Sequence, residues 1–488
     1  MPEIRRFDQI TLGCANATNE ATQFPQLLLD GYLDSHGLGK ELLEGHRFLV
    51  LGPKGSGKTA VAEHLRLVAD SDPSSTFVTL CNLGDFPYSD FRSKLGSEVA
   101  QERYPGGWSW LLLGTMLSSF ARDAGGQNSD DGLFQEVTGA LARTGLFAEN
   151  SDGRKSGSPR GLRLKLAGTV ALGIGAALEF ALEPGAELPT LRLAMLKNAT
   201  KGFRSESRHL LILDGLDDVL SQPEVRYDAL AGLLYAVGDL NYAFRTAETP
   251  AKIILLCRTE LFDRLPSANK NKMRMDDAVV LDWYDNPARG ERCRLGDLVN
   301  LRTRMSDPRV DDVFRSFLPK SLGGKPMLQW LLDLTRCTPR DFIQLLTCIQ
   351  GKSGNREGLL PEDVVIAGVR EYSRSYFMPE IRDELAGYVQ PAQIESVFRL
   401  FSSLRNWHFT YSELKDLAIR EQLDSLDLAS IMQTLFECSA IGNSFPREDK
   451  PGYFDIRYKY RNPTSSLNLA KGEIQLHKGL WKGLGVSY

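Results

Sequence analysis

Short apolar runs alternate with helical patterns along the N-terminal part of the chain. The runs are rich in Val, Ile, Leu and Phe; four lie at 47–51, 77–83, 209–213 and 252–257, and a fifth candidate lies at 278–283. Apolar runs of this kind, separated by helices, are typical of a parallel sheet that is covered on both faces. We therefore predict an α/β fold built on a parallel sheet.

A long insertion separates the second and third runs. The intervening residues, 84–208, are far more than one crossover helix requires. The polar stretch at 149–159 has linker composition, and Leu162, Leu164 and Leu166 then alternate with basic residues. We predict a small hairpin there, within an insertion at 100–200 to which the sequence assigns no function.

The C-terminal half is mainly helical. Patterns at 297–304, 327–334 and 340–349 predict a helical subdomain over 294–350, and the Gly-rich segment 351–358 marks a boundary. Beyond Pro391, three helical patterns (394–401, 412–420 and 428–438) precede two alternating runs (453–460 and 473–477). Three helices followed by a hairpin is the order of a winged-helix domain. We therefore expect a core at 1–350, a linker or helical segment at 351–390 and a winged-helix domain at 391–488.

The first apolar run leads directly into a glycine-rich loop. Residues 52–59 read Gly-Pro-Lys-Gly-Ser-Gly-Lys-Thr, which fits the P-loop pattern G-x-x-x-x-G-K-[ST], and a helical pattern follows. In such a loop, backbone N–H groups surround a phosphate, the lysine bridges the β- and γ-phosphates, and the last hydroxyl binds Mg²⁺. The predicted nucleotide-binding residues are Gly52, Pro53, Lys54, Gly55, Ser56, Gly57, Lys58, Thr59 and Ala60. For Lys54 a solvated side chain is the alternative.

Acidic residues follow the third run, in the sequence His209-Leu-Leu-Ile-Leu-Asp-Gly-Leu-Asp-Asp218. Asp214 ends a predicted buried strand, and with Thr59 it is expected to hold Mg²⁺. Asp217 or Asp218 is expected to orient or deprotonate an attacking water. The alternative is that these two aspartates cap the next helix.

Two arginines are candidates for sensing a γ-phosphate. Arg258 ends the fourth run, and its planar, charged guanidinium matches a phosphate group. Arg340 opens a helical pattern in Thr338-Pro-Arg-Asp-Phe342 and is a second candidate. The alternatives are a solvated arginine at a strand end and an ordinary helix N-terminus.

The nucleotide class follows from a missing motif. No N-K-x-D is found, because Asn269-Lys-Asn-Lys272 carries Lys where an aspartate that reads guanine would stand. We therefore predict ATP, with Mg²⁺, as the cofactors.

On these motifs the chain resembles the STAND and AAA+ P-loop ATPases, in which a D-G-x-D-[DE] motif and a sensor strand ending in arginine recur. More narrowly, it is similar from about Leu27 onward to a bacterial P-loop ATPase family that opens with G-x-K-G-x-G-K-T-A. Further shared features are a tryptophan-led helix (Trp108–Leu112), a P-R-D step (Pro339–Asp341) and a tail (Tyr458–Pro463 and His477–Leu480). The resemblance implies an ATPase core with a winged helix, in a family often encoded with anti-phage defence systems. Asp218 stands where many STAND proteins have Glu.

Composition and charge limit the partners and the cellular compartment that we expect for this protein. The 58 basic and 62 acidic residues give a formal net charge of −4, so no global field draws the protein to nucleic acid or anionic membranes. No apolar stretch reaches the length of a membrane helix. The seven cysteines are scattered and form no C-x-x-C pair, and the N-terminus has no apolar leader segment, so we expect a reducing cytoplasm.

The C-terminal segment is locally basic. From Pro451 onward it carries Arg457, Lys459, Arg461, Lys471, Lys478 and Lys482 against only two acidic residues. Such a wing, at 457–482, either grips a phosphate backbone or packs on the ATPase core as a lid, and we favour the lid. The expected function is an ATP-dependent switch that assembles with, or activates, a protein partner or further copies of itself. The alternatives are a DNA-binding ATPase and a nucleotide-binding scaffold without turnover.

Overall fold

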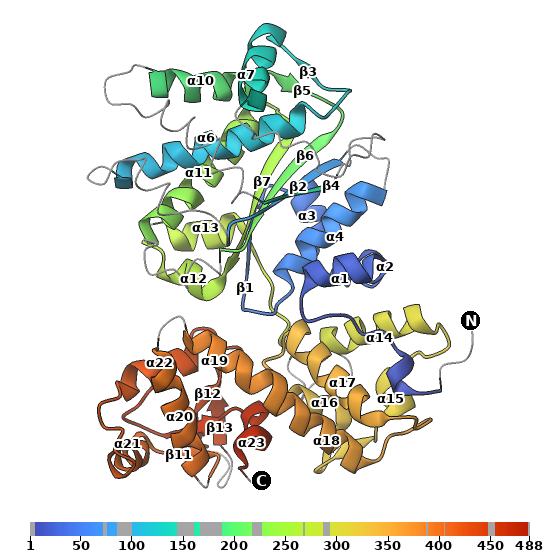
Figure 1. The fold of residues 1–488 in the computed structure, drawn as a ribbon, viewed down its shortest axis with the longest axis vertical. Helices are drawn as coiled ribbons and strands as arrows, with labels where there is room; N and C mark the ends of the chain where they lie inside the picture. Colours follow the sequence, from blue (N-terminus) through green and yellow to red (C-terminus); the bar gives the residue numbers. More distant parts are fainter. Residues whose placement is uncertain are drawn as a thin grey trace. The chain divides into compact units, whose positions relative to one another are not determined.

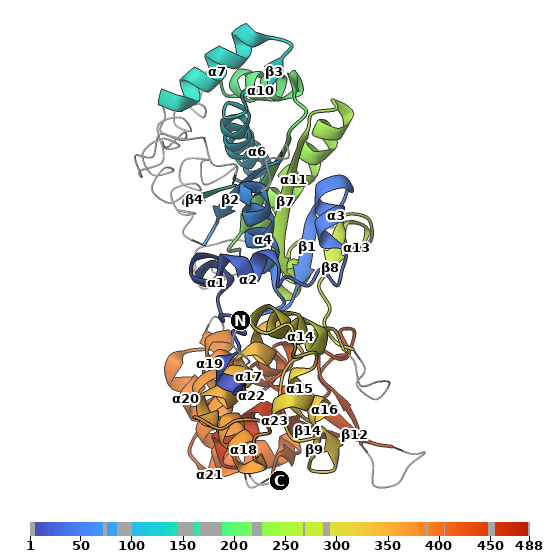
Figure 2. The same ribbon diagram turned by 90° about the vertical axis from the view of Figure 1, so that its right-hand side faces the viewer.

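The computed structural model describes residues 5–71, 76–84, 100–143, 161–165, 188–216, 227–266, 269–285, 293–386, 389–404, 406–447 and 454–486 (Figures 1 and 2). By their internal contacts the residues form two compact units. We call residues 34–54 and 58–281 the sheet unit, and residues 1–33, 55–57 and 282–488 the helical unit. Each unit is described by itself.

A six-stranded parallel sheet forms the centre of the sheet unit (Figure 1). Its strands, in spatial order, are β4 (Gly161–Lys165), β2 (Thr76–Asn82), β6 (Arg208–Asp214), β7 (Ala251–Arg258), β1 (Leu49–Gly52) and β8 (Ala278–Val280). His209–Leu213 and Ile253–Cys257 are buried throughout, because helices cover both faces of the sheet. All five predicted runs are strands, and the predicted α/β fold class is confirmed.

Helices pack on both sides of this sheet (Figure 1). On one side lie α6 (Ala100–Phe120) and α11 (Tyr227–Thr246), and on the other lies α4 (Lys58–Ser71). The α6 and α11 backbones approach closely because α11 has a glycine at the crossing: a Cβ on Gly232 would lie 2.7 Å from Cβ of Tyr104. The other helices among the described residues of this unit are α3 (Leu38–Glu44), α7 (Asp131–Arg143), α10 (Leu188–Lys201), α12 (Thr259–Arg264) and α13 (Lys270–Asp276).

The described part of the predicted hairpin is a single strand: residues 161–165 form β4, which pairs in parallel with β2 over Val78–Asn82. The residues that would complete the hairpin lie outside the described part of the chain. Alternation along the sequence fits any edge strand, and it does not identify a partner that lies so far away in the chain. Elsewhere in the insertion, β3 (Gln127–Asn128) and β5 (Phe203–Arg204) form a short antiparallel pair.

In the helical unit, the N-terminal segment packs on helices that follow the sheet unit in sequence. The segment contains η1 (Phe7–Gln9), α1 (Ala17–Gln23) and α2 (Pro25–Leu29). Glu20 of α1 is buried against Arg302 of α14 (Arg294–Ser306), with oxygen–nitrogen distances of 2.7 and 3.2 Å. Phe7 is fully buried in the core of this unit. The contact between Glu20 and Arg302, which are nearly 300 residues apart, was not predicted from the sequence.

The helices after α14 form one packed group with that segment. They are α15 (Val313–Phe317), α16 (Met327–Leu332), α17 (Pro339–Ser353), α18 (Glu362–Tyr372), a π-helical turn η5 (Ser373–Phe377) and α19 (Met378–Ala386), with the short antiparallel pair β9 (Ser321–Leu322) and β10 (Lys325–Pro326). Buried residues of α17 and α18 share one core with residues beyond Pro391. One boundary between the two compact units falls at 281/282. The domain boundaries expected at 350/351 and 390/391 stay predictions.

The last hundred residues have the order of helices and strands of a winged helix. The helices are α20 (Pro391–Ser403), α21 (Tyr411–Arg420), α22 (Leu428–Glu437) and α23 (Lys478–Leu484). The antiparallel sheet runs in the order β11 (His408–Phe409), β14 (Glu473–Leu476), β12 (Ile441–Pro446) and β13 (Phe454–Arg457).

The pairing inside this sheet corrects one prediction. The two expected strands do not pair with each other, because both pair with β12, which the sequence analysis missed. Gly442, Asn443 and Pro446 have low strand propensity, and they disguise β12 in the sequence.

No helix of the described part of the chain is long and apolar enough to cross a membrane. All seven cysteines lie in the described part, and no disulfide joins them.

Candidate functional site

The carboxyl ends of three neighbouring strands, β1, β7 and β6, carry predicted site residues of the sheet unit. Gly52 at the end of β1 is in register with Arg258 at the end of β7, and Asn82 of β2 is in register with Asp214 of β6. Since β7 lies between β1 and β6, the P-loop strand and the acidic strand flank Arg258. Ligands bind at this edge in open α/β sheets.

The strongest contact at this edge joins Thr59 to Asp214. The Thr59 hydroxyl, in the first turn of α4, donates a 2.7 Å hydrogen bond to Oδ2 of Asp214. The other carboxylate oxygen of Asp214 accepts the backbone N–H of Gly215 at 2.8 Å. The two predicted Mg²⁺ ligands are thus side by side, although 155 positions separate them in sequence.

Lys58 lies against the loop that it belongs to. Its ammonium donates to the carbonyl oxygens of Gly52 at 2.9 Å and Pro53 at 3.1 Å, and the residue is 7% exposed. Both acceptors are neutral carbonyls, so this hydrogen bonding leaves the charge of Lys58 available for an anion.

The tip of the P-loop, residues 55–57, belongs to the helical unit. Gly55 and Gly57 have left-handed backbone angles, with φ of 82° and 97°, on either side of Ser56. Alternation of this kind turns successive N–H groups toward one concave face, which binds anions. The Ser56 hydroxyl is buried and has no hydrogen-bond partner within the described residues, so it is a further donor for a phosphate oxygen.

Two donors of the helical unit hold the carbonyls of this tip. The indole N–H of Trp283 donates to the Ser56 carbonyl at 2.8 Å, and the backbone N–H of Arg340 donates to the Gly55 carbonyl at 3.3 Å. Gly55 also has no room for a side chain, because a Cβ there would lie 3.0 Å from Oγ1 of Thr338.

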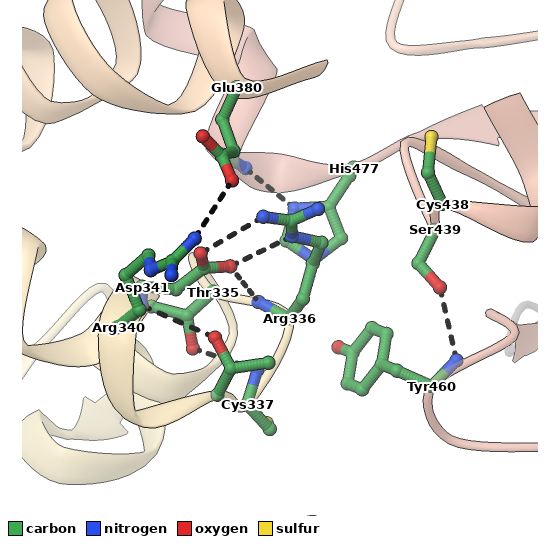
Figure 3. A network of polar contacts seen from close by, with 12 residues as sticks. Thr335, Arg336, Cys337, Arg340, Asp341, Glu380, Cys438, Ser439, Tyr460 and His477 are labelled. Carbon is green, nitrogen blue, oxygen red and sulfur yellow. Dashed lines mark hydrogen bonds and ion pairs between the residues drawn. The ribbon is translucent and has the colours of Figure 1, made fainter. Parts of the chain in front are cut away.

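Arg340 begins α17 in a charged environment (Figure 3). Its guanidinium lies 3.6 Å from Oε1 of Glu380 on α19. The neighbouring pair is more buried: Arg336 donates to Asp341 at 2.9 and 3.0 Å, and Asp341 also accepts the Tyr376 hydroxyl at 2.9 Å. Burial opposes the charge of Asp341, but Arg336 outweighs it and holds the pKa of that carboxyl below its ordinary value. The start of α17 is therefore anchored by charge.

The donor set fits ATP and Mg²⁺. Mg²⁺ prefers oxygen ligands, and in phosphate sites it takes only one or two of them from the protein. Thr59 and Asp214 supply those two, while Lys58 and the N–H groups of the loop suit the phosphates. The described residues contain no cluster of three or more His, Cys, Asp or Glu side chains that would form a separate metal site.

Three further residues, Asp217, Asp218 and Arg258, were predicted for the site. Asp217 and Asp218 lie outside the described residues. Arg258 is placed at the end of β7, where it precedes α12 as its N-cap residue. Sequence analysis missed Trp283 and Glu380. A tryptophan at the end of the predicted run 278–283 was the only signal for the first, and none existed for the second.

The basic C-terminal segment is largely engaged within its own unit. Asp333 accepts ion pairs from Lys478 at 2.7 Å, Lys325 at 2.7 Å and Arg461 at 3.3 Å. Burial acts against its charge, but these cations lower the pKa of Asp333 to about 2. Lys459 lies 3.6 Å from Glu437. Arg457, with its side chain 50% exposed, pairs with Asp455 at the surface.

A second polar cluster of the sheet unit superficially resembles a catalytic triad. Nδ1 of His209 lies 2.9 Å from the Ser119 hydroxyl, and Nε2 lies 3.3 Å from Asp123. Ser119 is 2% exposed and His209 is fully buried, so no substrate reaches them. Burial lowers the pKa of His209 to about 4, and the group is neutral at pH 7. This cluster stabilises the fold.

No protein-family profile matches the sequence, and no curated protein matches it. Among solved structures, the chain is similar to the Aeropyrum pernix Orc1 protein, whose structure is in complex with DNA. The identity is 14%, the match covers 90% of this chain and 92% of that chain, and the TM-score is 0.38.

Proposed function

We propose that this protein is a Mg²⁺-dependent ATPase that works as a switch. The observation that carries the proposal is the 2.7 Å hydrogen bond between Thr59 of the P-loop and Asp214 of β6. A hydroxyl and a carboxylate at this distance are the two protein ligands that a Mg²⁺ bound to β- and γ-phosphates requires. When bound, Mg²⁺ neutralises charge that develops on the transferred phosphoryl group.

In the proposed site each residue has a role. Lys58 and the loop N–H groups bind the phosphates, and Asp217 or Asp218 orients the attacking water. Arg258 and Arg340 respond to the γ-phosphate. The contact between the Arg340 N–H and the Gly55 carbonyl supports the role of Arg340, because it ties the start of α17 to the phosphate loop.

The output we propose is the assembly or activation of a protein partner. The continuous core that α17 and α18 share with the winged-helix elements supports this, because movement of α17 is transmitted to them. A role in bacterial anti-phage defence rests on the resemblance of the motifs alone. Identification of proteins that co-purify with the chain in ATP but not in ADP tests this output.

The proposal is tested by calorimetry with ATP, ADP and GTP, each with and without Mg²⁺, and by phosphate release. We expect ATP binding that Mg²⁺ strengthens, and turnover that is lost in Asp214→Asn. ATP binding without turnover favours a nucleotide-binding scaffold. Absence of ATP binding contradicts the proposal as a whole.

A DNA-binding ATPase is the second candidate, and one feature of the winged-helix domain favours it. A hollow of about 540 Å³ on this domain is lined by Arg457 and its ion-pair partner Asp455, by Phe445, and by polar side chains, among them Asn462, Thr464 and Ser465. The guanidinium, hydroxyl and amide groups match a phosphate backbone, whereas the Asp455 carboxylate opposes one. ATP turnover that DNA stimulates, and that falls steeply with salt, would support this function over the first.

A further inference from the structure

The segment that leaves the sheet unit carries two adjacent aromatic residues with different partners. Trp283 is 8% exposed, and its indole N–H donates to the Ser56 carbonyl at the P-loop tip. In a P-loop the N–H groups face the phosphates, so the carbonyls depend on other donors. Trp283 thereby fixes the orientation of a peptide that the bound phosphates would contact from its other side.

Tyr284, the next residue, faces the C-terminal segment. Its ring meets the ring of Tyr460 edge-to-face, with centroids 5.9 Å apart and an interplanar angle of 83°. The guanidinium of Arg461 lies 5.8 Å from the centroid of the Tyr284 ring. Aromatic pairs and cation–π contacts of this geometry are attractive.

Tyr460 and Arg461 are in turn fixed to the winged-helix domain and to α16. The backbone N–H of Tyr460 donates to the Ser439 hydroxyl at 3.1 Å (Figure 3). Arg461 donates to the Tyr460 hydroxyl at 2.7 Å and pairs with Asp333, which also holds Lys478 at the start of α23. A displacement of Tyr284 therefore disturbs an interconnected group of rings and charges.

We propose that Trp283 and Tyr284 link the P-loop to the winged-helix domain, so that binding of a nucleoside triphosphate changes how the segment 454–461 is held. Trp283 is a positioning residue for the loop, and Tyr284 transmits the displacement because it is its covalent neighbour. The inference rests on the proposed function, since it takes the P-loop as the nucleotide site.

Hydrogen exchange of the full chain, with and without MgATP, tests the link. In the wild type we expect ATP to change exchange in peptides that cover 454–461. Tyr284→Ala keeps the indole bond to Ser56, so we expect it to bind ATP within about twofold of wild type and to lose most of the exchange change. Trp283→Phe keeps an aromatic ring but removes the indole donor and part of the buried ring, and we expect about tenfold weaker ATP binding.

Tyr411→Ala is the matched control. Tyr411 is also a partly buried tyrosine of the helical unit with a cation over its ring, Lys415 at 4.7 Å, but it lies in α21, outside the cluster around Tyr284. We expect it to keep both ATP affinity and the exchange change. A merely structural loss of packing would affect Tyr411→Ala and Tyr284→Ala alike.

The outcomes distinguish a failure of the proposed function from a failure of the link alone. If the wild type does not bind ATP, the proposed function fails. If it binds ATP and exchange at 454–461 does not change, the function stands and the link is wrong. The link is also overturned if Tyr284→Ala shows the wild-type response, or if Tyr411→Ala loses it equally.

Discussion

The hydroxyl of Thr59 and the carboxylate of Asp214 form a 2.7 Å hydrogen bond, which joins the first turn of the P-loop helix α4 to the end of strand β6. The bond brings together the two oxygen atoms that we propose as Mg²⁺ ligands, from residues that are far apart in the chain. If both atoms bind Mg²⁺, a variant that removes one of them should bind Mg²⁺ more weakly, and a variant that keeps both should not.

Thr59→Ser and Thr59→Ala should differ in their response to Mg²⁺. Serine keeps the hydroxyl, so we expect MgATP binding close to wild type. Alanine removes a ligand and leaves Asp214 without this donor, so the gain in ATP affinity on adding Mg²⁺ should fall about tenfold, or roughly 1.4 kcal/mol. Calorimetry with and without Mg²⁺ measures this. Equal Mg²⁺ dependence in both variants would remove Thr59 from the metal site.

Lys58→Ala should abolish detectable ATP binding and leave the fold intact. The ammonium donates hydrogen bonds to two carbonyls of its own loop, and its charge is what the phosphates need. Circular dichroism checks the fold and calorimetry the binding. Lys197→Ala, a change at a surface lysine 3.9 Å from Asp239, is the control and should bind ATP normally. Unchanged affinity in Lys58→Ala would contradict the P-loop assignment.

Arg340 and Glu380 should change nucleotide preference in opposite directions. The carboxylate of Glu380 lies 3.6 Å from the guanidinium and competes with a phosphate for it. We expect Arg340→Ala to reduce the preference for ATP over ADP, and Glu380→Gln to raise it, each about three- to tenfold. Competition binding against a fluorescent nucleotide measures both. If both variants shift the preference in the same direction, Arg340 does not sense the γ-phosphate.

The sheet was predictable because its strands are buried on both faces. Runs such as His209–Leu213 and Lys252–Cys257 are apolar for a physical reason that is local to the sequence. Strand β12 was not predictable, because its glycine, asparagine and proline are tolerated only through pairing with β13 and β14. The contact of Glu20 with Arg302 was hidden for a different reason: ion pairs between distant residues leave no periodic trace in a sequence.

The sequence is most informative about the candidate site where the chemistry is concentrated in one motif. Residues 52–59 and Asp214 follow patterns that phosphate and Mg²⁺ impose directly. Trp283 and Glu380 act on the loop through single contacts, a hydrogen bond to the Ser56 carbonyl and an ion pair with Arg340. Many residue types supply such contacts, so only the fold identifies them.

His209 should make the sheet unit sensitive to acid. Burial lowers its pKa to about 4, below the ordinary 6.5, so the folded state binds fewer protons than the unfolded state between these values. Its contribution is fully present above about pH 6.5 and is lost as the pH falls to 4, at up to about 1.4 kcal/mol per pH unit. His209→Gln should flatten the dependence of the free energy of unfolding on pH in that window.

Urea titrations from pH 4.5 to 7.5, in steps of about half a unit, measure this dependence. His477 provides the comparison in the helical unit, because burial first, and then Arg461 and Arg336, lower its pKa to about 3. A spectroscopic probe in the sheet unit should report the effect of His209→Gln, whereas a probe in the helical unit should keep the pH dependence that His477 contributes. A wild-type slope in His209→Gln would mean that another group causes the acid sensitivity.

Arg461 and Arg457 separate the two interpretations of the basic segment. Arg461 pairs with the buried Asp333 and lies over two tyrosine rings of its own segment, so Arg461→Gln should cost about 1–3 kcal/mol of stability. Arg457 is half exposed, and Arg457→Gln should change stability by less than about 0.5 kcal/mol.

If the segment is structural, only Arg461→Gln lowers the melting temperature, and DNA affinity is negligible in both variants. If the segment binds DNA, Arg457→Gln should weaken a salt-sensitive complex for all sequences and reduce its salt slope by about one, as measured by fluorescence anisotropy. The ion pairs of Asp333 favour the first outcome, because they already neutralise part of the charge that a phosphate backbone would need.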